Sequence, residues 1–164
     1  MNKVFVGIGS NLGDKFNNIS QVFNSLKENS NFSNIKKSSL YETRPYGKVN
    51  QENFINAVFY FETNFSVNEI FNYTKDLEKK IGRIKRKRWG PREIDIDILL
   101  YNNIIYEDQK ITIPHKDLLN RDFVLVPLIE IDDKVKHPKE KKAIKQFLFE
   151  LTDRYIIKKI SLDF

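Results

Sequence analysis

The segment from Arg83 to Tyr101 reads RIKRKRWGPREIDIDILLY. Its first part carries cations and no acid, with Lys or Arg at positions 83, 85, 86, 87, 88 and 92. Its second part alternates acidic with apolar residues, which is the period-two pattern of a strand with one face in the core. Asp95 and Asp97 are therefore expected on the same face of this strand, roughly 6–7 Å apart.

The two expected carboxylates have a specific chemical use. Carboxylates on a rigid strand suit Mg²⁺, and a polyphosphate between acids and cations would be bound by metal ions and arginines together. The alternative is a solvated loop whose cations pair with exposed aspartates. Aspartate is a poor strand former, however, and needs a reason to occupy an apolar strand. The Gly90-Pro91 turn also brings Arg92 next to the acids, so the pattern favours a nucleotide-dependent transfer site.

The composition fits one domain spanning residues 1–164, long enough to bury a sizeable core. With 13 Phe and 7 Tyr, that core should be rich in aromatic rings. A net charge of +6 suits an anionic partner, and zero cysteines exclude disulfides and thiolate metal sites. The sequence shows neither a signal-peptide pattern nor an apolar run long enough to span a bilayer. We therefore expect a cytoplasmic monomer without a membrane partner.

Hydrophobic periodicity predicts the element order β-α-β-β-α-β. The strands are expected at residues 4–8, 35–43, 54–63 and 95–101, and the helices at 14–29 and 66–82. This order predicts a ferredoxin-like α+β fold, an antiparallel sheet with both helices on one face and the first and third strands in the middle. The open face would carry Asn56, Asp95 and Asp97. A C-terminal extension should add a hairpin at 104–113, helices at 123–131 and 143–151, and a strand at 155–161.

The glycine-rich segment GIGSNLG at residues 7–13 has two possible interpretations. A dinucleotide-binding loop needs its third glycine one place earlier, and no acid ends a following strand. It is not a Walker loop either, because Asp14 separates Gly13 from Lys15. We interpret the segment as a turn and helix cap after the first strand.

The motif at Arg88-Trp89-Gly90-Pro91-Arg92-x-Ile-Asp95-Ile-Asp97-Ile-Leu resembles the signature of the 6-hydroxymethyl-7,8-dihydropterin pyrophosphokinase family. The likeness spans nearly the whole chain, including Gly-Ser-Asn-Leu-Gly at residues 9–13. It implies transfer of pyrophosphate from ATP, the co-substrate, to the hydroxymethyl group of 6-hydroxymethyl-7,8-dihydropterin, with AMP as the other product, in folate biosynthesis. It also implies two Mg²⁺ ions held by Asp95 and Asp97, with catalysis by positioning and charge neutralisation.

The resemblance also implies roles for individual residues. The catalytic residues would be Arg83, Arg92, Asp95 and Asp97, and the nucleotide-binding residues would be Glu78, Arg86, Arg88, Trp89, Arg92, Ile98, Lys110, Thr112, His115 and Arg121. The basic segment is about one residue shorter than the family pattern, so which of Lys85, Arg86 and Lys87 contacts phosphate stays open. Lys110 and Lys116 replace an expected Arg and Tyr, which removes a bidentate donor and a nucleotide contact. No general base is identified, because the resemblance places His115 on the nucleotide.

For the pterin, the resemblance implies an aromatic sandwich and a polar edge. The substrate-binding residues would be Thr43, Pro45, Tyr46, Phe54, Asn56, Trp89, Asp95 and Phe123. Phe54 and Phe123 would stack on the ring, and the amide of Asn56 would pair with its donor and acceptor edge. The polar segments 45–51 and 83–91 are expected to close over both substrates as lids.

Two other functions are compatible with part of the pattern. An RRM-like RNA-binding module has the same element order and uses basic residues near aromatic ones. The strand at 54–63 lacks the Lys/Arg-Gly-Phe-Gly core of that module, and Asp95 and Asp97 would repel RNA without a metal. An inactive ATP-binding domain is disfavoured because both acids and their arginines are present. We therefore expect ATP and the pterin as partners, and no nucleic acid.

Overall fold

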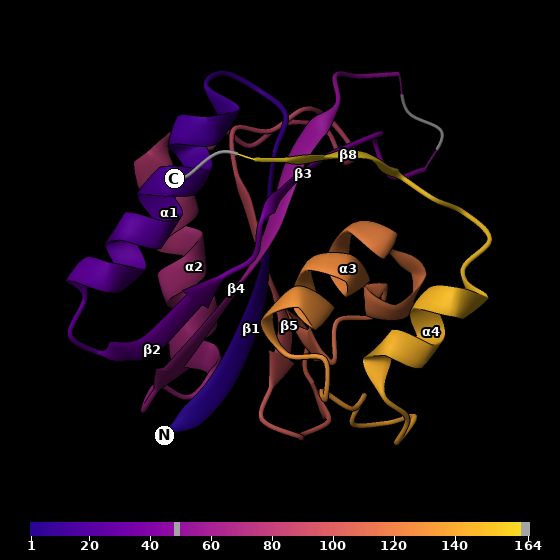
Figure 1. The fold of residues 1–164 in the computed structure, drawn as a ribbon. Coiled ribbons are helices and arrows are strands. Elements are labelled where there is room, and N and C mark those ends of the chain that lie inside the picture. Colours follow the sequence, from indigo (N-terminus) through magenta and orange to yellow (C-terminus); the bar gives the residue numbers. More distant parts are fainter. Residues whose placement is uncertain (48–49, 162–164) are drawn as a thin grey trace.

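The computed structural model describes residues 1–47 and 50–161. A six-stranded antiparallel sheet forms its centre, in the order β5-β1-β4-β3-β8, with β2 also paired to β4 (Figure 1). The strands are β1 (Asn2–Ser10), β2 (Phe32–Lys37), β3 (Leu40–Thr43), β4 (Phe54–Thr63), β5 (Asp95–Tyr101) and β8 (Ile156–Ile160). The first and third predicted strands, β1 and β4, lie in the middle of the sheet as expected. The predicted α+β class is confirmed.

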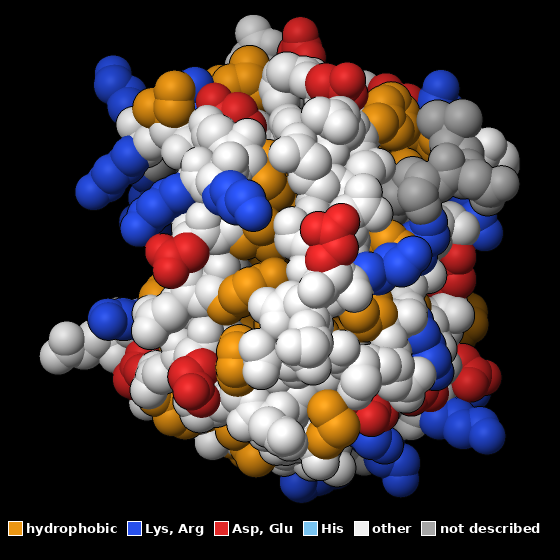
Figure 2. Space-filling view, turned by 90° about the vertical axis from the view of Figure 1, so that its left-hand side faces the viewer, with side chains coloured by type: hydrophobic (Ala, Val, Ile, Leu, Met, Phe, Trp, Pro, Cys, Tyr) orange, Lys and Arg blue, Asp and Glu red, His pale blue; other side chains and the backbone are white. Residues whose placement is uncertain are grey.

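Helices α1 (Lys15–Glu28) and α2 (Val67–Ile81) cover one face of the sheet (Figure 1). Ile19 and Ile70, one from each helix, are fully buried against Phe59 and Phe61 of β4. Burial of apolar side chains of this size stabilises the fold by about 1.5–3 kcal/mol each, as an upper estimate. Figure 2 shows this side of the molecule, where charged side chains surround small separate groups of apolar ones.

The other face of the sheet is covered over only part of its length. Helices α3 (Asp122–Ile131) and α4 (Ile144–Glu150) pack there, around a second apolar cluster that includes Val58, Tyr60 and Leu99. The uncovered end carries Asn56, Asp95 and Asp97, which line a pocket. The predicted open face is therefore present, and the C-terminal extension restricts it to one end of the sheet.

The ends of α2 follow local sequence signals. Ser66 and Glu69 form a capping box, in which each side chain accepts from the backbone N–H of the other. Gly82 ends the helix at φ +113°, a left-handed conformation that glycine adopts without strain. Ser66 and Gly82 bound the helix predicted at 66–82, whose last turn lies next to the edge strand β5.

Two predicted boundaries were wrong. The first strand does not end at Ile8, since β1 continues through Gly7 and Gly9, which pair with β4 on one side and β5 on the other. These glycines are therefore part of the sheet rather than of a turn. The predicted strand 35–43 is two strands, β2 and β3, because Ser38 uses both its backbone and its hydroxyl to pair with Val58 and so interrupts the ladder.

The C-terminal extension matches the prediction closely. Short strands β6 (Tyr106–Glu107) and β7 (Thr112–Ile113) form the hairpin, and a 3-10 helix at Leu118–Asn120 was not predicted. Positions 48–49 of the predicted lid 45–51, and 162–164 of the predicted domain, lie outside the described residues. Within the described part of the chain, each helix is too short or too polar to span a bilayer.

Candidate active site

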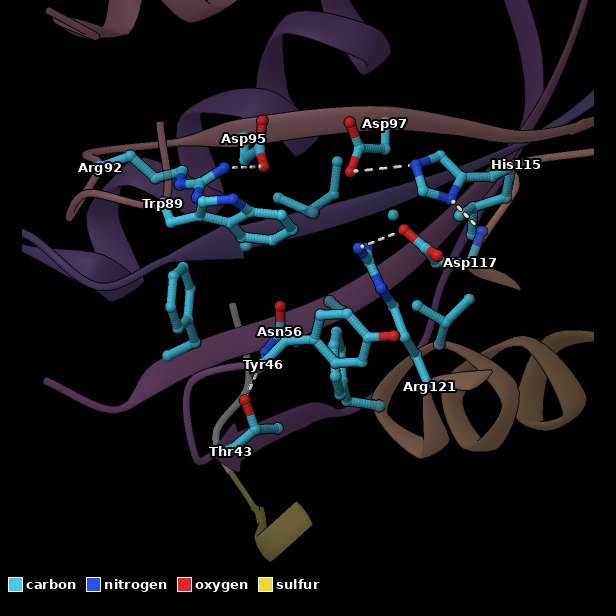
Figure 3. Close-up of a pocket in the computed structure, with 18 of the residues that line it drawn as sticks. Thr43, Tyr46, Asn56, Trp89, Arg92, Asp95, Asp97, His115, Asp117 and Arg121 are labelled. Carbon is cyan, nitrogen blue, oxygen red and sulfur yellow. Dashed lines mark hydrogen bonds and ion pairs between the residues drawn. The ribbon is translucent and has the colours of Figure 1, made fainter. Parts of the chain in front are cut away.

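A pocket of about 350 Å³ opens on the uncovered end of the sheet (Figure 3). Strands β1, β4 and β5 form its floor. One wall is the segment 83–92, which we call the basic loop. The opposite wall contains His115, Asp117 and Arg121, and aromatic side chains on both sides narrow the space between them. Residues far apart in sequence thus meet over the two aspartates of β5.

Asp95 is held by two arginines. Its Oδ1 accepts a hydrogen bond from Arg83 Nη1 at 2.8 Å, and its Oδ2 accepts one from Arg92 Nη1 at 2.7 Å. Burial opposes ionisation of this carboxyl, but the charges of Arg92 and Arg83 outweigh burial and keep the pKa of Asp95 below its ordinary value. Asp95 is therefore ionised and fixed in position at neutral pH.

Asp97 lies on the same face of β5 with a weaker partner. Its Oδ2 is 3.8 Å from His115 Nε2, beyond hydrogen-bond distance. Burial raises the pKa of Asp97, and the negative charge of Asp95 raises it further. Burial lowers the pKa of His115 in turn, so the imidazole is a poor counter-ion near pH 7. His115 Nδ1 accepts from the backbone N–H of Asp117 at 3.2 Å, which leaves the proton on Nε2, facing Asp97.

These two acids fit a divalent cation. A carboxylate with a raised pKa beside a second carboxylate is stabilised when a cation binds between or near them. Among the described residues, no group of three or more His, Cys, Asp or Glu side chains could hold a metal ion. The chain therefore offers two carboxylate ligands, and water or phosphate oxygens would have to supply the others.

Glu78 connects α2 to the aspartate strand. It is only 3% exposed, and its Oε1 accepts from the backbone N–H of Ile96 at 2.7 Å and from Lys75 Nζ at 3.0 Å. Its Oε2 lies 2.7 Å from Arg83 Nη1. Burial raises the pKa of Glu78, although the charge of Lys75 partly opposes the shift. Glu78 thus fixes the backbone between Asp95 and Asp97 and orients the arginine that holds Asp95.

Another part of the pocket combines a buried amide, that of Asn56, with aromatic side chains. Asn56 is buried and donates from Nδ2 to Thr43 Oγ1 at 2.6 Å. On the neighbouring strand Gly9 is paired with Asn56, and a Cβ on Gly9 would lie 2.8 Å from Asn56 Oδ1, so only glycine leaves room for this amide. Phe54 and Phe123 line the same space and offer apolar ring faces next to it. An amide between aromatic rings can recognise a heteroaromatic ligand.

Many of the predicted site residues line this pocket. These are Thr43, Tyr46, Phe54, Asn56, Arg83, Arg88, Trp89, Arg92, Asp95, Asp97, His115, Arg121 and Phe123. The predicted residues outside its lining are Pro45, Glu78, Arg86, Ile98, Lys110 and Thr112. Glu78 and Arg86 border a neighbouring hollow of about 430 Å³ under the basic loop. The side chain of Ile98 is buried in the α1 and α2 cluster, so only its backbone could meet a ligand at the pocket.

Sequence reasoning missed several residues at this site. Gly7 and Gly9 line the floor, and Lys75 lines both hollows. Lys75 could have been found, because it lies three residues before Glu78 and therefore on the same helix face. Asp117 bonds Arg121 at 3.1 Å across one turn, a pairing that the spacing of four residues permits.

The sequence matches the family model described as 7,8-dihydro-6-hydroxymethylpterin-pyrophosphokinase over residues 5–133. This chain belongs to that family. A 2-amino-4-hydroxy-6-hydroxymethyldihydropteridine pyrophosphokinase from Aquifex aeolicus is 41% identical over 153 residues, which is 93% of this chain and 94% of the relative. The protein of the same name from Haemophilus influenzae is 34% identical over 154 residues, covering 94% and 96%. The resemblance drawn from the motif is confirmed.

Solved structures agree on the fold. The chain superposes on a Plasmodium falciparum HPPK-DHPS structure with a TM-score of 0.71 at 15% identity, over 91% of this chain and 43% of that one. At that identity the likeness supports the fold alone. Membership of the pyrophosphokinase family does not favour the RRM-like alternative, whose element order this fold shares.

Proposed function

We propose that this chain transfers the pyrophosphoryl group of ATP to the hydroxymethyl oxygen of 6-hydroxymethyl-7,8-dihydropterin, a step of folate biosynthesis. One observation carries the proposal at residue level: Asp95 and Asp97 lie together on the pocket floor beside Arg83 and Arg92. Acids for metal and cations for phosphate are thereby gathered in one place. The relatives' names and the family match support the same reaction.

The reaction exchanges one phosphorus–oxygen bond for another. The hydroxymethyl oxygen forms a bond to the β-phosphorus of ATP and loses its proton. The bond from that phosphorus to the oxygen bridging toward the α-phosphate breaks, and AMP leaves with the bridging oxygen. Little covalent work falls to the protein, so positioning and charge stabilisation supply most of the catalysis.

The arginines present unused donors to an anion. Within residues 1–47 and 50–161, the buried Nε atoms of Arg92 and Arg121 lack a hydrogen-bond partner. A buried donor without a partner is costly, and a phosphate oxygen in the pocket would relieve that cost. Arg83 and Arg88 line the same pocket. We assign these four arginines to the polyphosphate, with Arg83 and Arg92 as the catalytic ones.

Asp95 and Asp97 would hold Mg²⁺, two ions according to the family pattern. When bound, Mg²⁺ would neutralise phosphate charge as a Lewis acid. His115 is assigned to the nucleotide rather than to proton transfer, because its Nδ1 already accepts the N–H of Asp117. No other side chain is assigned as a general base.

The pterin would lie between Phe54 and Phe123, with its polar edge on Asn56. Thr43 fixes the orientation of that amide through their 2.6 Å hydrogen bond. Trp89 is 46% exposed at the rim of the pocket, and we infer that it covers the substrates when the basic loop closes. Slower amide exchange in the basic loop with a nonhydrolysable ATP analogue and pterin would support closure, and unchanged exchange would contradict it.

The direct test mixes the protein with Mg²⁺, ATP and 6-hydroxymethyl-7,8-dihydropterin. AMP and the pterin diphosphate are the expected products. ADP would indicate transfer of a single phosphoryl group, and either that outcome or folded but inert protein would contradict the proposal. Omitting the pterin gives the control for ATP hydrolysis. That the chain acts as one domain, as a cytoplasmic monomer and without nucleic acid stays a prediction.

A further inference from the structure

Arg86 is engaged away from the pocket, in an ion pair with Glu93. Its Nη1 and Nη2 donate to Glu93 Oε2 and Oε1 at 2.8 and 2.7 Å, the parallel fork that a guanidinium makes with a carboxylate. The side chain of Glu93 is 16% exposed and that of Arg86 33% exposed. Arg86 is absent from the pocket lining, whereas its loop neighbours Arg88 and Trp89 belong to it.

Glu93 is anchored to the folded core at its own backbone. Its carbonyl accepts from Ser10 Oγ at 2.5 Å and from Asn18 Nδ2 at 2.9 Å, and both of those residues are buried. The preceding residue, Arg92, pairs through its N–H and C=O with Asn11. The carboxylate of Glu93 therefore extends from a fixed point at the end of β1 and the start of α1.

The ion pair closes residues 86–93 into a loop. Inside it, Gly90 N–H donates to Lys87 C=O at 3.0 Å, which makes a tight turn. Trp89 in this turn has φ +66°, a conformation that non-glycine residues keep only when surrounding contacts hold it. The ion pair between Arg86 and Glu93 is such a contact, because it links the residue before the turn to Glu93, which is anchored to the core.

We propose that Arg86 and Glu93 are positioning residues, whose ion pair holds the basic loop so that Arg88 and Trp89 face the pocket. In this arrangement Arg86 does not bind phosphate itself. The inference rests on the proposed function only for what Arg88 and Trp89 contact, since the order of the loop can be measured without substrate.

The competing explanation is that Arg86 binds phosphate and pairs with Glu93 only while no phosphate is bound. The two explanations predict opposite effects of Glu93→Gln on nucleotide affinity. If Glu93 competes with phosphate, Glu93→Gln frees Arg86 and tightens nucleotide binding. If the pair positions the loop, Glu93→Gln and Arg86→Ala both loosen the loop and weaken binding alike.

The experiment uses the full chain with Glu93→Gln, Arg86→Ala and the double variant. Trp89 is the sole tryptophan, so its fluorescence anisotropy reports on the basic loop. Without nucleotide, both single variants should lower the anisotropy and speed amide exchange over 84–91. The Kd of a nonhydrolysable ATP analogue with Mg²⁺ should rise about two- to fivefold in each, as expected for a partly exposed pair, and no further in the double variant. Tighter binding by Glu93→Gln, or additive losses in the double variant, would overturn the proposal.

Two further variants separate loop order from charge. Lys85→Ala removes a cation from the same loop and should leave the nucleotide-free anisotropy and exchange unchanged. The swap Arg86→Glu with Glu93→Arg should restore the nucleotide-free anisotropy and amide exchange toward wild type. If Arg86 instead bound phosphate, a glutamate at position 86 could not make that contact. Should the wild-type chain fail to bind the analogue at all, the proposed function fails, and the substrate-free readouts still decide the role of the pair.

Discussion

Asp95 and Asp97 lie two residues apart on one face of β5, yet only Asp95 is paired with arginines. Asp97 has His115 at 3.8 Å and a pKa raised by burial and by its neighbour. Asp95 is thus fixed by protein cations, whereas Asp97 lies beyond hydrogen-bond distance of His115. Both carboxylates face the pocket as candidate metal ligands, but of the two the arginines neutralise only Asp95.

The asymmetry predicts opposite effects of two isosteric changes on stability. Asp97→Asn removes an unfavourable charge, so at pH 7 the nucleotide-free protein should melt at a higher temperature than wild type. Asp95→Asn removes the carboxylate that pairs with Arg92 and leaves Arg83 with Glu78 alone, so this variant should melt lower. Thermal unfolding of both variants in chelator measures the difference, and a loss of stability in Asp97→Asn would contradict the assignment.

The same Asp97 change should abolish turnover although the fold is intact. A lost metal ligand removes several kcal/mol of charge stabilisation from the transition state. AMP formation with Mg²⁺, ATP and the pterin measures this effect, and near-ultraviolet circular dichroism confirms the fold. If the folded variant still produces AMP at the wild-type rate, Asp97 is not a metal ligand. Asp76→Asn, on the exposed face of α2, is the matched control.

Arg92→Ala should lower kcat by roughly 10²–10³, by analogy with deleting one preorganised donor. The backbone of Arg92 is held by Asn11 and does not depend on the side chain, so the loop should keep its attachment. Steady-state kinetics that separate kcat from KM provide the measurement. A change confined to KM would mean that Arg92 binds the ground state and the transition state equally.

Gly9→Ala should weaken pterin binding more than nucleotide binding. A Cβ at this position would lie 2.8 Å from Asn56 Oδ1, so the amide must turn away from Thr43 and from the ligand. Overpacking of this kind costs about 1–3 kcal/mol of stability. Gly7→Ala is the control, because the nearest atoms to its Cβ would be side-chain carbons of Leu99, at 3.3 to 3.6 Å, rather than the amide of Asn56. Separate titrations with the pterin and an ATP analogue test the prediction, and equal losses for both ligands would contradict it.

Much of the fold could be predicted because local signals agreed with the tertiary structure. The capping box at Ser66 and the glycine at 82 fixed α2, and the alternation after Glu93 fixed β5. The glycines at 7 and 9 misled the prediction, because glycine usually marks a turn. At position 9 glycine is required in the strand by the close approach of Asn56, which sequence alone cannot reveal.

The sequence predicted a set of residues, many of which line one pocket in the structure, but it did not predict the contacts between them. The family resemblance assigned Asp95, Arg92 and Arg83 to one site, and in the structure both arginines donate hydrogen bonds to Asp95. The partner of Arg86 could not be predicted, because six cations lie between residues 83 and 92 and the sequence alone does not show which of them lies near an acid. The selection of Glu93 by Arg86 depends on the anchoring of Glu93 to β1 and α1, a contact across more than 70 residues.

Glu130 should make stability depend on pH, away from the pocket. It accepts from Ser39 and from Tyr41, whose hydroxyl lies 2.6 Å from Oε2, and so ties α3 to β3. Burial opposes ionisation, but these hydrogen bonds hold the pKa of Glu130 below its ordinary value of 4.5. A lowered pKa means that the stabilisation is fully present above pH 4.5 and is lost as the pH falls below it, because the unfolded chain then binds more protons.

Glu130→Gln should therefore be less stable than wild type at pH 7, and the difference should shrink as the pH falls from 5 toward 3. Urea unfolding at several pH values measures the difference in free energy of unfolding between the two proteins. Glu150→Gln, an exposed glutamate on α4, should track wild type throughout. A difference between Glu130→Gln and wild type that stays constant from pH 7 to pH 3 would mean that the carboxylate charge of Glu130 does not stabilise the joint between α3 and β3.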